Sequence, residues 1–206
     1  MAIKIHVRME FIEPVLGTGN ADPEIHRRVI AEKAGEAPKI EEEVEAIGVD
    51  DVFERGTTVF PKDDDGVPFA WDYQVKGFMK DAAKMLRKAD GMGKETKKVK
   101  AYKQEIDGLI FPQPRKIRFI LPKGGEIAMC QRPLRAQTMQ GERVTLVSSE
   151  ELPEGTTCEF DVVLLKDALL GAVVEWFEYG EYRGFGQWRN SGKGRFVCSI
   201  SDPVTI

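Results

Sequence analysis

The chain has 206 residues, with 30 Lys and Arg against 34 Asp and Glu, so its formal net charge is −4. This length supports a hydrophobic core without disulfides, and 42% hydrophobic with 31% charged residues excludes wholesale disorder. No apolar run approaches the roughly 20 residues of a membrane span, and the N-terminus lacks a signal peptide's apolar stretch. We therefore expect a cytoplasmic protein without a membrane partner, whose bulk charge argues against nucleic-acid binding.

Side chains that commonly hold metals are scarce. The chain has three cysteines and two histidines, none at metal-ligand spacing from another: Cys130, Cys158, Cys198, His6 and His26. Asp63–Asp65 lacks the further spaced ligands of a calcium loop and is predicted to form a charged hairpin tip. We expect buried, reduced thiols, and neither a metal nor a cofactor.

The first predicted element is a strand over residues 3–11, where apolar and polar side chains alternate. One face is wholly apolar, and the other carries Lys4, His6 and Arg8. Such a polar sheet face is either a site for single-stranded nucleic acid or an ordinary solvated surface.

Residues 22–33 are predicted as a short helix that opens at Asp-Pro, with an acidic insertion over residues 36–54 after it. Residues 57–60 and 67–70 flank a Lys-Asp-Asp-Asp-Gly turn, which indicates a hairpin.

The clearest helix covers residues 72–88, because its apolar side chains recur at helical spacing and its lysines lie away from them. The lysine-rich stretch at 91–104 has no apolar periodicity and is predicted as a basic loop, which is either a phosphate clamp or a merely soluble loop.

Two strands at 143–149 and 157–165 are predicted to form a hairpin, followed by a helix over 167–179 and a last strand over 196–200. Without insertions, the order is strand, helix, strand, strand, helix, strand. This order predicts a single α+β domain of ferredoxin-like fold over residues 1–206, with both helices on one face of an antiparallel sheet.

Charge is unevenly distributed along the chain. Residues 36–54 carry eight acids and one base, a net −7, so the remaining residues sum to +3. Residues 94–118 carry a net +5 and residues 180–195 a net +3. Because exposed charges are screened beyond about 8–10 Å, a ligand responds to regional charge, and basic surfaces remain compatible with the acidic total.

Residues 180–195 combine glycines, bases and aromatics, which suits contact with phosphates and bases. The alternative is a tight structural loop whose aromatics complete the core. The candidate binding residues of this loop are Arg183, Gly184, Phe185, Gly186, Trp188, Arg189, Lys193 and Arg195.

A second candidate segment, residues 132–143, contains Arg132, Arg135 and Arg143 among amide and hydroxyl side chains. Arginine donors suit phosphates and base edges, but pairing with nearby acids such as Glu142 or Glu150 would give them a purely structural role.

Three short motifs resemble the repeat-associated mysterious proteins, the RNA-binding backbone and processing subunits of CRISPR systems. They are an alternating strand with a glycine loop at 3–20, Tyr-Gln-Val-Lys-Gly-Phe at 73–78, and the glycine-rich loop before the last strand. The best-fitting positions are Gly17, Gly19, Lys76, Gly77, Gly184 and Gly186. The resemblance implies a ferredoxin-like fold and RNA as the ligand. Processing members cleave RNA without metal, commonly with a histidine near the first helix, which makes His26 the candidate general base.

The sequence also resembles an uncharacterised family of proteins encoded by phages and prophages of Gram-positive bacteria, through residues 73–78, 132–138, 141–143 and 186–190. That resemblance implies no activity.

Three functions follow as hypotheses. The first is a non-catalytic protein, encoded by a phage, that binds RNA or single-stranded DNA. The second is an interaction protein that inhibits a host defence complex by imitating a CRISPR subunit or sequestering a nucleotide, with the acidic segment as its protein contact. The third is a metal-independent processing ribonuclease. The sequence leaves the oligomeric state open.

Overall fold

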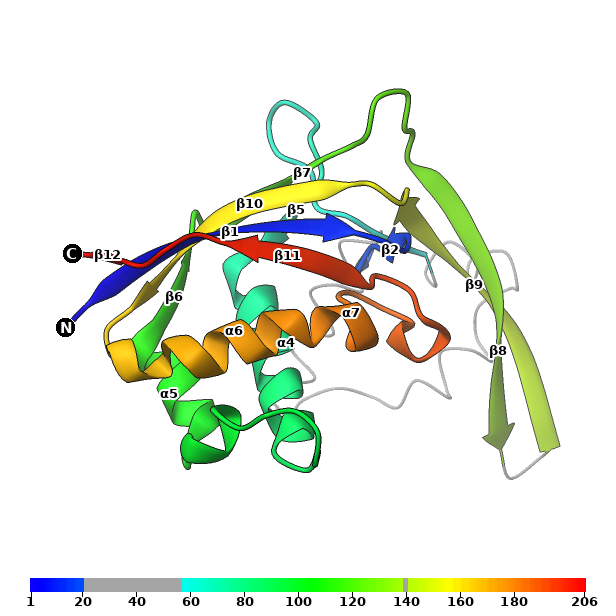
Figure 1. Ribbon diagram of the computed structural model, residues 1–206. Coiled ribbons are helices and arrows are strands. Elements are labelled where there is room, and N and C mark those ends of the chain that lie inside the picture. The colour runs from blue at the N-terminus through cyan, green and yellow to red at the C-terminus, as the bar shows by residue number, and fades with distance from the viewer. Residues whose placement is uncertain (21–56, 139–140) are drawn as a thin grey trace, which may run out of the picture. The chain divides into compact units, whose positions relative to one another are not determined.

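The computed structural model describes residues 1–20, 57–138 and 141–206 and forms two compact units (Figure 1). The first unit comprises Met1–Val15, Pro61–Glu126 and Leu152–Ile206, and the second Leu16–Phe60 and Ile127–Glu151. The predicted helix at 22–33, which includes His26, and the acidic insertion at 36–54 lie outside the described residues.

The sheet of the first unit confirms the predicted α+β, ferredoxin-like plan. Its strands are β1 (Ile3–Phe11), β5 (Phe69–Trp71), β6 (Ile110–Gln113), β7 (Lys116–Ile120), β10 (Thr157–Leu164), β11 (Phe196–Ile200) and β12 (Val204–Thr205). The order is β11-β1-β10-β7-β5, with every pairing antiparallel. β6 and β7 pair with successive parts of β10 and together act as the second strand of the plan.

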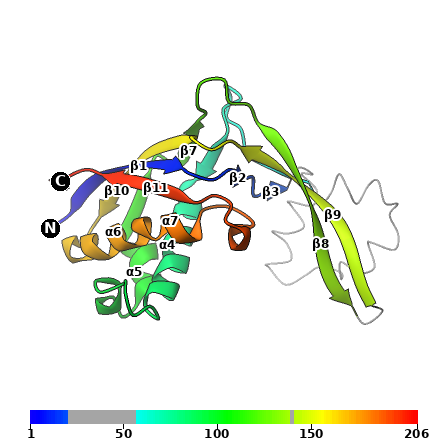
Figure 2. The same ribbon diagram turned by 45° about the vertical axis from the view of Figure 1, so that its right-hand side comes forward.

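The helices of the first unit lie on one side of this sheet (Figures 1 and 2). They are α4 (Asp72–Leu86), α5 (Tyr102–Leu109), α6 (Leu170–Glu178) and α7 (Gly180–Arg183), with 3-10 turns η1 (Thr96–Lys98), η2 (Asp167–Leu169) and η3 (Arg189–Ser191). Among the described residues, no helix is long and apolar enough to cross a membrane.

β1 shows why the sheet is covered on one side only. Its odd-numbered residues from Ile3 to Phe11 are all buried, and the even-numbered ones are more exposed, as the alternation predicts. At its end, Phe11 meets Phe119 of β7 and Phe196 of β11 edge-on, with ring centroids 5.8 and 5.9 Å apart. Burial of these side chains against α4 and α6 fixes which face stays open.

The second unit is built on a hairpin of β8 (Ala128–Thr138) and β9 (Gly141–Leu152). β9 also pairs with β2 (Val15–Leu16) and, in parallel, with β4 (Thr58–Val59). β4 in turn pairs with β3 (Gly19–Asn20).

The first predicted hairpin forms only next to its turn, where Lys62 and Pro68 make an antiparallel bridge and the Asp63 carboxylate accepts hydrogen bonds from the amides of Asp65 and Val67. Farther from the turn the prediction was wrong, because residues 57–60 contribute β4 to the second unit and β5 pairs with β7. The second predicted hairpin, of residues 143–149 and 157–165, was wrong in its pairing. β9 pairs with β8, and β10 pairs with β1, where the Gly155 amide donates to the Phe11 carbonyl just before β10 begins.

Part of the stretch predicted as a loop, residues 91–104, is ordered by Glu175 of α6. Its carboxylate accepts hydrogen bonds from the backbone amides of Glu95 and Thr96 and from the Thr96 hydroxyl, at 2.7–2.8 Å. Partial burial acts to raise the pKa of Glu175, but these hydrogen bonds outweigh it and hold the pKa below its ordinary value. η1 and the first residues of α5 therefore replace the predicted loop.

Replacing Glu175 with glutamine should lower the free energy of unfolding by about 2 kcal/mol at neutral pH, because charge-assisted hydrogen bonds are lost. The folded-state pKa is depressed, so this contribution is complete above the unfolded-state value of about 4.3 and disappears as pH falls through the folded-state pKa. Urea unfolding of both proteins at neutral and acidic pH measures the difference. A gap between them that does not shrink at acidic pH would contradict this account.

Candidate nucleic-acid interface

The glycine-rich loop at 180–195 folds back on itself. The Phe185 amide donates to the Gly194 carbonyl at 2.7 Å, and the Gly194 amide donates to the Pro14 carbonyl at 2.8 Å. Gly194 has a positive φ, and a Cβ there would lie 1.9 Å from the Phe185 carbonyl oxygen. Close backbone packing thus requires glycine at this position.

Two arginines of this loop converge on a single acid of α4. Arg183 Nε and Arg189 Nη1 each donate to Asp81 Oδ2 at 2.8 Å, and Arg183 Nη1 also donates to Asn190 Oδ1 at 2.8 Å. All three charged side chains are partly exposed. Two guanidinium groups therefore share one carboxylate, which leaves one positive charge and several unused N–H donors at this point.

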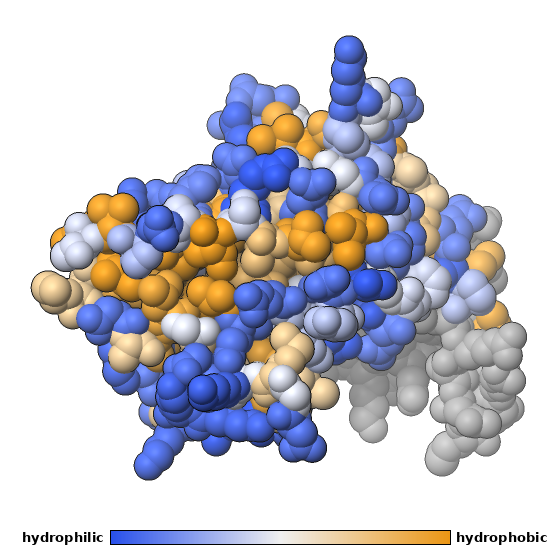
Figure 3. All heavy atoms as spheres, in the orientation of Figure 1, coloured by the Kyte–Doolittle hydropathy of each residue, from blue (hydrophilic) through white to orange (hydrophobic). Residues whose placement is uncertain are grey.

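The two arginines line a shallow hollow of about 390 Å³. Its remaining lining comes from Gly186, Gln187, Trp188 and Asn190, with 41% of Trp188 exposed. Figure 3 shows hydrophilic residues over this loop and hydrophobic ones over the adjoining strands, where Val197 of β11 is exposed. The hollow offers guanidinium and amide donors beside an indole ring, a combination that suits a phosphate with a neighbouring base.

The other residues of this loop that were predicted to bind do not line the hollow. Phe185 is 7% exposed and packs against Phe11 and Phe78, so it belongs to the core. Arg195 is partly exposed and donates from Nε to the Glu181 carbonyl at 2.6 Å, and Lys193 is also partly exposed. Gly184 needs its glycine for the same reason as Gly194, because a Cβ would lie 2.5 Å from the Lys193 carbonyl oxygen.

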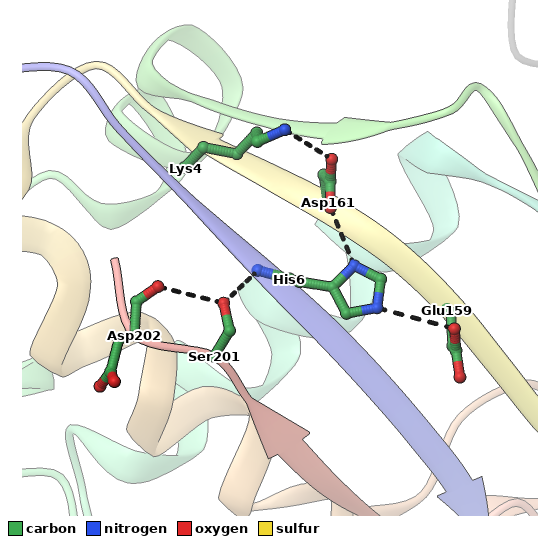
Figure 4. Close-up of polar contacts among 6 residues, drawn as sticks. All are labelled: Lys4, His6, Glu159, Asp161, Ser201 and Asp202. Carbon is green, nitrogen blue, oxygen red and sulfur yellow. Dashed lines mark hydrogen bonds and ion pairs between the residues drawn. The ribbon is translucent and has the colours of Figure 1, made fainter. Parts of the chain in front are cut away.

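The open sheet face carries Lys4, His6 and Arg8, as the alternation predicts, but each has an acidic partner. Figure 4 shows the partners of Lys4 and His6. Asp161 of β10 accepts from Lys4 Nζ at 3.1 Å and lies 2.9 Å from His6 Nδ1. Arg8 pairs with Glu10 at 3.0 Å and Glu159 at 3.3 Å.

The contacts from His6 and Lys4 hold the pKa of Asp161 below its ordinary value, so this carboxylate stays charged near neutral pH. Such exposed pairs add little to stability, but they cancel the positive potential over the centre of the face.

The arginines predicted at 132–143 belong to the β8–β9 hairpin of the second unit. Arg132 is 6% exposed, and its Nη1 donates to the Ser149 hydroxyl at 3.2 Å. In the backbone register, Arg135 lies opposite Val144 and Arg143 opposite Ala136.

Sequence reasoning missed Asp81, which positions both arginines of the hollow. Asp81 lies beside Lys80 in sequence and three residues before Lys84, so the helix offers it local basic neighbours, and no sequence signal pointed to Arg183 and Arg189.

The described residues contain no group of three or more His, Cys, Asp or Glu side chains that could hold a metal. Cys130, Cys158 and Cys198 are free thiols. Burial raises the pKa of Cys158 to about 12 and that of Cys198 to about 11, so neither is a nucleophile at neutral pH.

Comparison with known proteins supports the fold. No protein-family model and no curated protein matches the sequence. Among solved structures 146 chains match, including one in the cryo-EM structure of the Type III-B Cmr-beta bound to cognate target RNA. That match has a TM-score of 0.55 at 9% identity and covers all of this chain but 61% of the other. The two chains therefore share a fold.

The glycines of the loop allow a matched test of its packing. Gly192 and Gly194 both have positive φ, but a Cβ at Gly192 has no neighbour closer than 3.9 Å. Gly192→Ala should cost about 1–2 kcal/mol from backbone strain alone, and Gly194→Ala should cost roughly 1–3 kcal/mol more from overlap. Thermal unfolding measures both. Equal losses would mean that the close packing at Gly194 does not exist.

Proposed function

We propose that this protein binds single-stranded nucleic acid, with RNA as the preferred strand, through the hollow of the glycine-rich loop. The observation that carries the proposal is the sharing of Asp81 by Arg183 and Arg189, which leaves positive charge and N–H donors beside the exposed indole of Trp188. In this arrangement the arginines take a phosphate, and the indole stacks with an adjacent base.

Electrostatics favour the loop over the open sheet face as the contact surface. The loop with Asp81 carries four bases and two acids, whereas Lys4, His6 and Arg8 are matched by three carboxylates of β1 and β10. A polyanion gains counterion release only where charge is left uncompensated.

The choice of RNA rests on the solved structure with the similar fold, which was determined bound to cognate target RNA. That likeness supports RNA as the ligand class to test first, with single-stranded DNA as the comparison.

Arg189→Gln should weaken binding of a labelled single-stranded RNA about tenfold, because one charge-assisted contact is lost. It should also reduce the slope of log affinity against log salt by about 0.7, the value for one single-strand phosphate contact. Fluorescence anisotropy between about 50 and 200 mM salt gives both quantities.

Arg8→Gln is the matched control, because it removes the same charge from a position already paired with Glu10 and Glu159. Its affinity and salt slope should equal those of the unmodified protein. Equal weakening by the two substitutions would mean that the loop is not the specific contact. A lack of binding to RNA and DNA single strands would overturn the proposed function itself.

A further inference from the structure

One corner of the open sheet face differs from its centre, because its cations meet aromatic rings instead of carboxylates. Arg115, between β6 and β7, has its guanidinium carbon 5.6 Å from the ring centroid of Trp71. Lys116 places Nζ 5.4 Å from the ring centroid of Phe69. Over residues 1–20, 57–138 and 141–206, neither cation has a carboxylate partner, although both are exposed. At this edge, Arg115 and Lys116 therefore carry positive charge that no carboxylate of the described residues pairs with.

The register of β5 against β7 explains this grouping. Phe69 lies opposite Arg118 and Trp71 opposite Lys116, so the two aromatic side chains share a face with exposed side chains of β7. Arg118 does have acidic partners, in Asp63 and Asp65. A backbone hydrogen bond joins the start of α4 to the residue before β7, because the Asp72 amide donates to the Arg115 carbonyl at 3.0 Å.

The aromatic side chains form a stack that ends at the surface. Phe69 meets Trp71 edge-on at 4.9 Å, and Trp71 stacks on Tyr73 with centroids 6.2 Å apart and planes 13° apart. Tyr73 remains 55% exposed, so ring surface is left for a further aromatic ring. Partial burial and the neighbouring Asp72 raise the pKa of Tyr73, so the phenol stays uncharged near neutral pH.

The stack is held before any ligand arrives. Trp71 is the N-cap residue of α4, and its amide donates to Gln74 Oε1 at 2.8 Å. The ring of Trp71 is further held by Phe69, which meets it edge-on, and by the guanidinium of Arg115 over it. A base that stacks on this corner meets a rigid platform, which lowers the entropy lost on binding.

We propose that Tyr73, backed by Trp71 and flanked by Arg115 and Lys116, is a stacking platform for an unpaired nucleobase of a single strand. Two features together select this ligand: an exposed aromatic stack, which takes the flat face of any base, and uncompensated cations, which take the adjoining phosphates. The inference rests on the proposed function, because the ligand is the same class of strand, but it concerns different residues from the glycine-rich loop.

The test separates base contacts from phosphate contacts. Tyr73→Ala should weaken binding of a single-stranded RNA by about 5- to 150-fold, the range for loss of one stacked base, whereas Tyr73→Phe should bind as the unmodified protein does. An abasic strand of equal length should bind to the unmodified protein and to Tyr73→Ala equally. A 2-aminopurine base in the strand should be quenched by the unmodified protein and Tyr73→Phe more than by Tyr73→Ala.

Tyr102→Ala is the matched control, because it removes the same side chain from beside an arginine, Arg87. Tyr102 lies in α5 and, among the described residues, stacks on no other aromatic ring. It should leave RNA binding unchanged. Unchanged binding of base-containing RNA by Tyr73→Ala overturns the platform. If Arg189→Gln still weakens both kinds of strand, the proposed function stands without it. If the unmodified protein binds no strand at all, the proposed function fails and the platform with it.

Discussion

The alternation of side chains in β1 is the constraint on which the rest of the first unit depends. β1 is paired on both sides, with β10 and β11, so its apolar side chains face the helices and its charged ones cannot leave the opposite face. β10 then supplies Glu159 and Asp161 at positions where they meet the bases of β1. One strand thus fixes both the core and the charge balance of the open face.

Strong periodicity made much of the fold predictable from sequence. The strand at 3–11 and the helix at 72–88 are present, because each has a full apolar face that must be buried. The strand at 196–200 is also present, with Phe196 buried, but it is not the last strand because β12 follows it. Strand pairing was harder to predict, because it depends on distant contacts. Strands that are neighbours in sequence were predicted to form hairpins, but β10 pairs with β1 along its whole length and β9 pairs with β8.

The sequence predicted which residue types make up the candidate site, but not how they are arranged in space. The sequence shows glycines, arginines and aromatics in one segment, but the partner of Arg183 and Arg189 lies about a hundred residues away, at Asp81. The same difficulty applies to Arg8, whose acidic partner Glu159 is even more remote in sequence. Counting charges along the sequence shows where basic residues are concentrated. Which of them stay unpaired depends on the acids that the fold places beside them.

An acid inside a surface proposed for a polyanion needs a physical reason. Without Asp81, two guanidinium groups within hydrogen-bond distance of one point would repel each other and spread into solvent. With it, both are held in place while one positive charge remains, so the fold has already met the entropy cost of ordering two long side chains. Arg115 and Lys116 are held differently, over rings that neutralise no charge. Carboxylate and aromatic ring are therefore two ways to preorganise a cation, and at the centre of the open face, where Glu10, Glu159 and Asp161 meet Lys4, His6 and Arg8, the carboxylates leave no net positive charge.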